Sequence, residues 1–198
     1  MPLALKRKCT FEDYLALERS DPQIRYEYLR GEIFAMGGAS ESHNLIAWNI
    51  AGELRQQMKD RPCRAYTADM KVRVTAADAG QYPDVLALCG EPEFHDDRRD
   101  CLLNPSLIVE VLSPSTEAYD RGEKFAVYRR LASLREYLLV TQDRMRAELF
   151  VRQAGDRWLL TEFSDADDCM TLESVGCVLP LREIYDKVGL ALAPAGEA

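Results

Sequence analysis

Hydrophobic residues recur at two different spacings along the chain, and these spacings predict both helices and strands. Over residues 41–59 the apolar side chains return every third or fourth position, which is typical of one face of a helix. Residues 84–89 (DVLALC) and 106–112 (SLIVEVL) are almost continuously apolar, as expected for strands that are covered on both faces of a sheet. The pattern therefore predicts a layered fold in which helices pack against a sheet with buried central strands.

Shorter signals divide the rest of the chain. Thr10 and Asp13 predict the capped start of a helix that runs to about residue 19. A hairpin is expected from residues 26–29 and 32–36 around the turn Arg30-Gly31. Local periodicity predicts strands over residues 65–74, 136–141, 145–152, 158–163 and 170–178, and helices over residues 116–131 and 180–188. This order predicts one domain, residues 1–198, of mixed α/β (α+β) class, with a mixed central β-sheet flanked by helices and preceded by an N-terminal helix and hairpin.

The composition is that of an ordinary globular protein. With 198 residues, 47% of them hydrophobic and 29% charged, the chain is long enough to bury one sizeable core. No stretch reaches the roughly 18 consecutive apolar residues that a membrane-spanning helix needs. The N-terminal sequence MPLALKRKC lacks the apolar segment of a signal peptide. We therefore expect a cytoplasmic protein with no membrane partner.

The six cysteines are expected to be reduced thiols. None of them forms a CxxC pair, and only two histidines are present, so a structural zinc site is not expected. Free cysteine behaves as a small hydrophobic residue, which suits Cys89 and Cys177 because they lie in or beside apolar runs.

The net charge of the chain is −8 at pH 7. A protein that coats nucleic acid by releasing counterions needs a basic surface, so this charge argues against nonspecific coating. A local nucleic-acid site stays compatible with an acidic surface, because a bound divalent cation and a few basic side chains reverse the local field.

One carboxylate interrupts a strand that is otherwise apolar. Glu110 lies in the middle of LIVEVL, and Asp84 begins the other central strand, directly after Pro83. An isolated buried carboxylate either stays protonated or costs several kcal/mol. A divalent cation shared with a second carboxylate removes this cost, and oxygen ligands favour Mg²⁺ or Mn²⁺ over zinc. Asp84 and Glu110 are thus candidate metal ligands, and an ion pair between Glu110 and Lys124 without a metal is the alternative.

Two of the predicted helices place a polar residue on their buried face, near their N-terminal ends. Lys124 shares one helical face with Asp120 and with the natural inward residue Tyr128. His43 heads the apolar stripe of the helix over residues 41–59. In α/β folds helices begin near the carboxyl ends of the preceding strands, where such folds commonly place their sites.

These residues carry a family resemblance. Asp84 in YPDVLAL and Glu110 in LIVEVL resemble the PD…(D/E)xK pattern of the restriction-endonuclease-like nuclease superfamily. More closely, the chain is similar to the Uma-two family of endonucleases. The matching stretches span most of residues 10–190 and are YEYLRGEI, SHNLIAWNIAGEL, YPDVLAL, PSLIVEVLSPST, YDRGEKFAVYRRL and EYLLV.

The resemblance implies a restriction-endonuclease-like core with a mixed sheet, Mg²⁺-dependent hydrolysis of DNA phosphodiester bonds, and a homodimer. The sequence departs from the superfamily at one position. The lysine of the E-x-K pattern would fall two residues after Glu110, where this chain has Leu112. In this branch the lysine lies on the following helix, and Lys124 in YDRGEKF matches that version.

The resemblance also implies roles for single residues. Asp84 and Glu110 would hold Mg²⁺ (or Mn²⁺), which activates a water, while Lys124 orients the nucleophile or stabilises charge on the phosphoryl group. Glu27 and His43 match recurrent positions of the family. Glu27 would extend the acidic cluster toward a second metal, and His43 would position a water or contact a phosphate. Simpler roles stay open, such as a solvated hairpin charge for Glu27 and a helix-start hydrogen bond for His43.

A metal-dependent endodeoxyribonuclease is the favoured function, because Asp84, Glu110 and Lys124 are all present. One alternative is a fold relative that binds or regulates as a dimer without cleaving, although such a copy usually lacks an acid or the lysine. Another is a metal-dependent hydrolase of a different phosphoester. The acidic net charge favours a small, single-stranded or structured substrate over ordinary duplex DNA.

Overall fold

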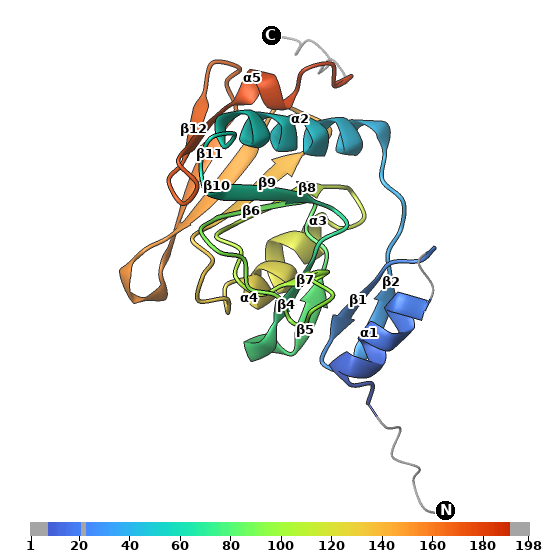
Figure 1. Ribbon diagram of the computed structural model, residues 1–198. Helices are drawn as coiled ribbons and strands as arrows, with labels where there is room; N and C mark the ends of the chain where they lie inside the picture. Colours follow the sequence, from blue (N-terminus) through green and yellow to red (C-terminus); the bar gives the residue numbers. More distant parts are fainter. Residues whose placement is uncertain (1–7, 21–22, 191–198) are drawn as a thin grey trace, which may run out of the picture.

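The computed structural model describes residues 8–20 and 23–190, which form a larger and a smaller β-sheet, a separate two-stranded hairpin and helices packed against the sheets (Figure 1). The larger sheet has six strands in the order β11-β10-β9-β8-β6-β3, and the smaller has five in the order β2-β1-β5-β4-β7. Strands β12 and β13 form a separate hairpin. Within the described ranges, no helix is both long and apolar enough to cross a lipid bilayer.

The larger sheet is mixed, as the sequence predicted. β8 (Leu107–Leu112) runs parallel to β9 (Glu136–Thr141), whereas the other neighbouring strands pair antiparallel. Every residue of β8 and β9 is buried, because both strands are central and covered on both faces. The strands next to this central pair are β6 (Val85–Cys89) and β10 (Ala147–Arg152), and the edge strands are β3 (Cys63–Thr67) and β11 (Trp158–Phe163).

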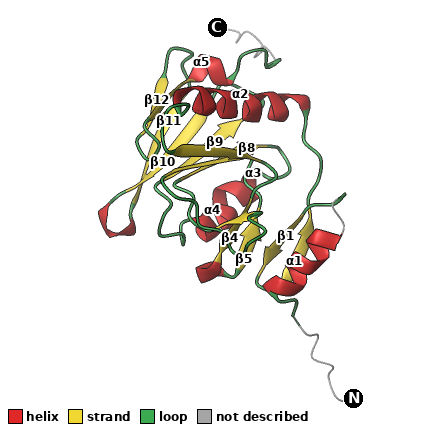
Figure 2. Cartoon of the chain, viewed as in Figure 1, coloured by secondary structure: helices red, strands yellow, loops and turns green. Residues whose placement is uncertain are grey.

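Helix α2 (Glu41–Gln57) covers one face of the larger sheet (Figure 2). The side chain of Ser40 caps its N-terminus by accepting a hydrogen bond from the backbone N–H of His43. The buried residues of the helix, among them Ile50, pack with Val109 and Val111 in the core beneath it. The amphipathic pattern therefore gave the right element and the right buried face.

The opposite face of the sheet packs against a helical segment that differs from the expected helix over residues 116–131. It consists of α3 (Glu117–Tyr119), a π-helical turn η2 (Asp120–Lys124) and α4 (Phe125–Tyr128). The wider turn changes the register of the helix, and Asp120 and Lys124 both become buried. The prediction of a regular helix was wrong here because helical periodicity assumes 3.6 residues per turn throughout.

The smaller sheet contains some of the residues that the sequence analysis had assigned to a single strand, residues 65–74. Residues 65–74 were expected to be continuous, but they divide between β3 in the larger sheet and β4 (Lys71–Val74) in the smaller one. A turn closed by a 3.0 Å hydrogen bond from Met70 N to Thr67 O separates the two strands. The short strands β5 (Ala79–Gln81) and β7 (Cys101–Leu102) were not expected at all.

The N-terminal elements match the prediction, whereas the C-terminal ones differ. α1 (Phe11–Ser20) is followed by the hairpin β1 (Tyr26–Leu29) and β2 (Glu32–Ala35). The expected strand over residues 170–178 is instead the hairpin β12 (Cys169–Leu172) and β13 (Cys177–Pro180), which turns at Gly176 in a left-handed conformation. The last helix, α5, is shorter than expected and covers Leu181–Ile184. Short 3₁₀ turns cover Thr75–Ala77 (η1) and Ala154–Asp156 (η3).

Two cysteines contradict the expectation of reduced thiols. Cys63 on β3 lies directly opposite Cys89 on β6, and the two form a disulfide with a Cα–Cα distance of 3.9 Å. The sequence did not indicate this pairing, because the two cysteines are 26 residues apart and meet only through the register of β3 and β6. Four cysteines carry free thiols: Cys9, Cys101, Cys169 and Cys177.

Candidate active site

Strand pairing brings the carboxylates of Asp84 and Glu110 to the same place. β6 and β8 pair with Val85 opposite Val109, so the antiparallel register places Asp84, one residue before β6, opposite Glu110. Asp84 Oδ2 accepts a 2.7 Å hydrogen bond from the backbone N–H of Val111, which fixes the Asp84 carboxylate against β8. The two acids therefore come from neighbouring central strands of one rigid sheet.

Lys124 reaches this site from the π-helical turn on the other layer. Its Nζ lies 2.9 Å from Glu110 Oε1 and 3.4 Å from Glu27 Oε1. It also donates a 3.3 Å hydrogen bond to the backbone carbonyl of Tyr82. Only 7% of the Lys124 side chain is exposed, so its ammonium group is held inside the protein by these acceptors.

Glu27 enters the site from the smaller sheet. It lies on β1 and is buried, and its Oε1 accepts a 3.1 Å hydrogen bond from the backbone N–H of Tyr82. The same oxygen faces Lys124, so Glu27 connects the N-terminal hairpin to the helix that carries the lysine. A solvated hairpin charge, the simpler role considered for Glu27, is excluded by this burial.

His43 lies at the more open side of the site. Its Nε2 is 2.9 Å from Asp84 Oδ1, so both oxygens of Asp84 have a partner. The exposed fractions of the His43 and Asp84 side chains are 17% and 18%, compared with 3% for Glu110. A ligand from solvent would therefore meet His43 and Asp84 before it met Glu110.

Asp120 is a member of the site to which the sequence analysis gave no role. It is buried, and its Oδ1 lies 3.7 Å from Lys124 Nζ, one helical turn further along the chain. The signal was present, because Asp120 and Lys124 were placed on one face at i, i+4 spacing. What the sequence did not show was that Asp120 is buried along with the lysine rather than solvated.

The site holds more negative than positive charge. Burial raises the pKa of Glu110 well above its usual range, and Lys124 offsets this only in part, since Asp84 and Asp120 act in the opposite direction. Burial also raises the pKa of Asp120. By itself burial lowers the pKa of Lys124, but Glu110 and then Glu27 outweigh it and the pKa is raised. These directions agree with one ammonium group shared among several carboxylates: the lysine stays charged, and the acids compete for it.

Asp84 and Glu110 fit a hard divalent cation. Glu110 Oε1 is buried and, although close to Lys124, receives no well-aligned hydrogen bond. Each Asp84 oxygen has one partner and keeps a second lone pair. Among the described residues no three His, Cys, Asp or Glu side chains form a complete metal cage. Mg²⁺ does not need one, because it commonly binds one or two carboxylates and keeps several waters.

Comparison with known proteins places the chain in a family. The family model Uma2, described as "Putative restriction endonuclease", matches residues 11–182. Two uncharacterised proteins of Synechocystis sp. are similar. Protein sll1609 is 35% identical over 82% of this chain and 91% of its own length, and slr1290 is 33% identical over 93% and 95%.

A crystal structure with the same fold is known. It is a putative nuclease of the DUF820 group from Anabaena variabilis, which superposes with a TM-score of 0.74 over 89% of this chain and 97% of that one. Only 15% of the aligned residues are identical, so this likeness concerns the fold alone. The chain has the restriction-endonuclease-like fold of that structure, and the family match over residues 11–182 shows that it belongs to the Uma2 family.

Proposed function

We propose that this protein is a divalent-metal-dependent endonuclease that hydrolyses phosphodiester bonds in DNA. The observation that carries the proposal is the position of Lys124, whose Nζ lies 2.9 Å from Glu110 although Leu112 occupies the usual lysine position. This distance supports a role for Lys124, from a different element, as the lysine of the nuclease pattern. Membership of the Uma2 family supports the nuclease class.

In this proposal Asp84 and Glu110 hold Mg²⁺ or Mn²⁺. The cation would supply Lewis-acid activation of a water and of the phosphoryl oxygen. Lys124 presents a charged donor beside Glu110, where it would orient the attacking water or stabilise developing negative charge. His43, on the open side of Asp84, is placed to contact a phosphate or a water.

Glu27 and Asp120 would act mainly on Lys124. Both carboxylates lie within 4 Å of its ammonium group and keep it charged inside the protein. The sequence analysis considered a second-metal role for Glu27. Its contacts with Lys124 and with the Tyr82 N–H favour the positioning of the lysine instead.

We further propose that the chain acts as one domain and assembles as a homodimer. The larger sheet ends at β11, whose outer edge is unpaired among the described strands. Leu159 and Leu160 on this strand are exposed on opposite faces of the sheet. An open edge with apolar residues on both faces is suited to strand addition, and a second copy of the chain offers the same edge.

Cleavage assays test the endonuclease directly. Supercoiled plasmid and labelled single-stranded DNA are incubated with purified protein in Mg²⁺, Mn²⁺ or EDTA. We expect cleavage with either cation and none with EDTA. We expect Lys124→Ala to lower the rate about 100-fold or more, because a charged donor at the reacting centre is lost. Lys59→Ala, which removes an exposed lysine away from the site, is the matched control and should cut like the unmodified protein.

The opposite result would favour another reading of the same geometry. The 2.9 Å pair between Lys124 and Glu110 also fits a non-cleaving relative in which the lysine only neutralises a buried acid. Absence of cleavage on both DNA forms, at high protein concentration and with either cation, would overturn the endonuclease proposal. Equal cleavage by the unmodified protein and Lys124→Ala would point to a contaminating nuclease.

A further inference from the structure

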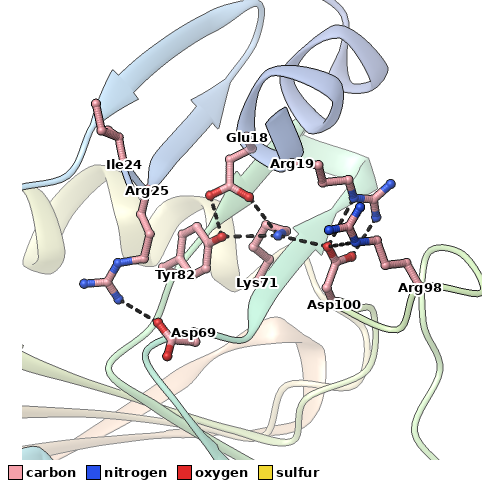
Figure 3. A pocket seen from close by; sticks show the side chains of 9 residues that line it. All are labelled: Glu18, Arg19, Ile24, Arg25, Asp69, Lys71, Tyr82, Arg98 and Asp100. Atoms are coloured by element: carbon pink, nitrogen blue, oxygen red, sulfur yellow. Dashed lines mark hydrogen bonds and ion pairs between the residues drawn. The ribbon is translucent and has the colours of Figure 1, made fainter. Parts of the chain in front are cut away.

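A second cluster of buried charges lies next to the candidate active site. This cluster, called the Glu18 cluster here, consists of Glu18, Lys71, Tyr82 and Asp100, and it lines a cavity of about 200 Å³ (Figure 3). Lys71 Nζ lies 2.8 Å from Glu18 Oε2 and 3.3 Å from Asp100 Oδ2. The side chains of Lys71 and Glu18 are only 5% and 6% exposed, so this ion pair is almost as buried as the one at Glu110.

The hydroxyl of Tyr82 is anchored within the Glu18 cluster. It donates a 2.6 Å hydrogen bond to Glu18 Oε1 and accepts one of 3.2 Å from Lys71 Nζ. Figure 3 shows the ring of Tyr82, which lies in the connection between β5 and β6, pointing toward these two side chains.

The backbone of Tyr82 belongs to the other cluster. Its N–H donates to Glu27 and its carbonyl accepts from Lys124, at 3.1 Å and 3.3 Å. Asp84 follows two residues later, and the intervening Pro83 restricts the backbone between them. One residue therefore contacts both buried networks, with its side chain in one and its main chain in the other.

We propose that Tyr82 is a positioning residue for Lys124, and that the Glu18 cluster is the anchor through which it acts. The inference rests on the proposed function of the Asp84–Glu110–Lys124 site. Fixing the hydroxyl of Tyr82 fixes the carbonyl that holds Lys124 and the N–H that holds Glu27. α1, which supplies Glu18, thereby contributes to the geometry of the site.

The test removes the hydroxyl group of Tyr82, which contacts the Glu18 cluster, and keeps its aromatic ring. Tyr82→Phe deletes only the hydroxyl, so the main-chain contacts can persist but lose their fixed position. Tyr28→Phe is the matched control, because Tyr28 is a buried tyrosine of the same layer whose hydroxyl also lies 3.0 Å from a carboxylate, that of Asp78. Three quantities are measured for both variants: kcat and KM for DNA cleavage, the melting temperature, and the rate at which an amine-reactive acylating reagent labels Lys124 in the folded protein, followed by mass spectrometry.

We expect Tyr82→Phe to lower kcat about 10-fold while KM changes less than about 2-fold, because a displaced catalytic group costs rate rather than ground-state binding. We also expect the labelling of Lys124 to accelerate several-fold, since its ammonium group loses a fixed acceptor. Tyr28→Phe should change neither quantity, even if its melting temperature falls by as much.

The labelling rate separates this inference from the proposed function, because it does not depend on nuclease activity. Faster labelling of Lys124 in Tyr82→Phe alone supports the positioning role even if the unmodified protein cleaves no DNA. Unchanged labelling of Lys124 in Tyr82→Phe overturns the inference even if DNA is cleaved. Parallel changes in both variants, in proportion to their melting temperatures, also overturn it, because they indicate a general loss of stability.

Discussion

Glu110 lies within a strand whose residues are all buried, and its carboxylate is tolerated there because Lys124 is beside it. Exchanging such a pair for apolar residues is often neutral or stabilising, so stability alone does not account for its presence. Removing one partner is different, because the remaining charge has no compensation. The proposed chemistry would account for the cluster of Glu27, Asp120 and Glu110 around Lys124, which a contribution to folding does not require.

The raised pKa of Glu110 predicts how cation binding depends on pH. Burial favours the protonated carboxyl in the folded protein, so the stability that Glu110 contributes is complete below its unfolded pKa and is lost as pH rises through the folded pKa. A divalent cation needs the deprotonated form and displaces this proton. We expect Mn²⁺ affinity, measured by isothermal titration calorimetry, to increase with pH by up to about 10-fold per pH unit.

Glu110→Gln provides the test of that assignment. The variant keeps the size of the side chain but has no carboxylate, so we expect Mn²⁺ affinity to fall and its pH dependence to flatten while the fold persists. Glu91→Gln, which changes an exposed glutamate, should retain the normal affinity. If Glu110→Gln instead lowers the stability of the fold but leaves the Mn²⁺ affinity of the folded protein unchanged, a purely structural ion pair of Glu110 with Lys124 would be favoured.

At the scale of elements, we expect the π-helical turn η2 to set the position of Lys124. The turn spans Asp120–Lys124 and includes Gly122, and both charged ends of it are buried. The backbone carbonyl of Asp120 also accepts a 2.9 Å hydrogen bond from Tyr137 on β9, which ties the turn to the sheet. A π-helical turn contains one more residue than an α-helical turn, so closing it into a regular helix would rotate the residues after it by about 100° relative to those before it.

Deleting Gly122 tests the importance of the wide turn. We expect the segment to close into a regular helix, so that Lys124 or Asp120 leaves the site and DNA cleavage falls to the level of Lys124→Ala. Far-UV circular dichroism should stay close to that of the unmodified protein. Gly122→Ala is the control: a Cβ there meets open space, so the turn and the activity should both persist. Full activity of the deletion variant would show that η2 does not set the position of Lys124.

The elements that the sequence predicted well are those whose hydrophobic pattern alone indicates which residues are buried. β8 and β9 are fully buried apolar runs, and α2 has a regular apolar stripe beneath a capping serine. The π-turn and the division between β3 and β4 depend on where neighbouring layers lie, which local periodicity does not contain. For the site, Asp84, Glu110 and Lys124 could be selected from sequence, because a buried strand acid and an inward lysine are unusual. The role inferred for Tyr82 was invisible, because it comes from main-chain contacts made in three dimensions.

At the scale of the whole molecule, the open edge of β11 predicts the mode of assembly. We expect a dimer by size-exclusion chromatography with light scattering, and we expect the double variant Leu159→Lys/Leu160→Lys to shift it to monomer. Lysine at a free edge disfavours strand pairing because it would bury charge. Val178→Lys, an exposed apolar position on β13, is the control and should remain dimeric. A monomeric unmodified protein, or a dimer that survives the β11 substitutions, would refute this interface.

The disulfide between Cys63 and Cys89 has a consequence for connectivity. It closes a covalent ring that leaves the larger sheet after β3, passes through β4 and β5 of the smaller sheet, and returns with β6. Tyr82 and Asp84 lie inside this ring, whereas Glu110 and Lys124 lie outside it. In the chain-entropy account, a ring of this size lowers the entropy of the unfolded chain and so raises the free energy of unfolding by about 3 to 4 kcal/mol. The segment that carries Asp84 therefore stays covalently closed when the protein unfolds, whereas β8 and the helical segment with Lys124 gain no such restraint.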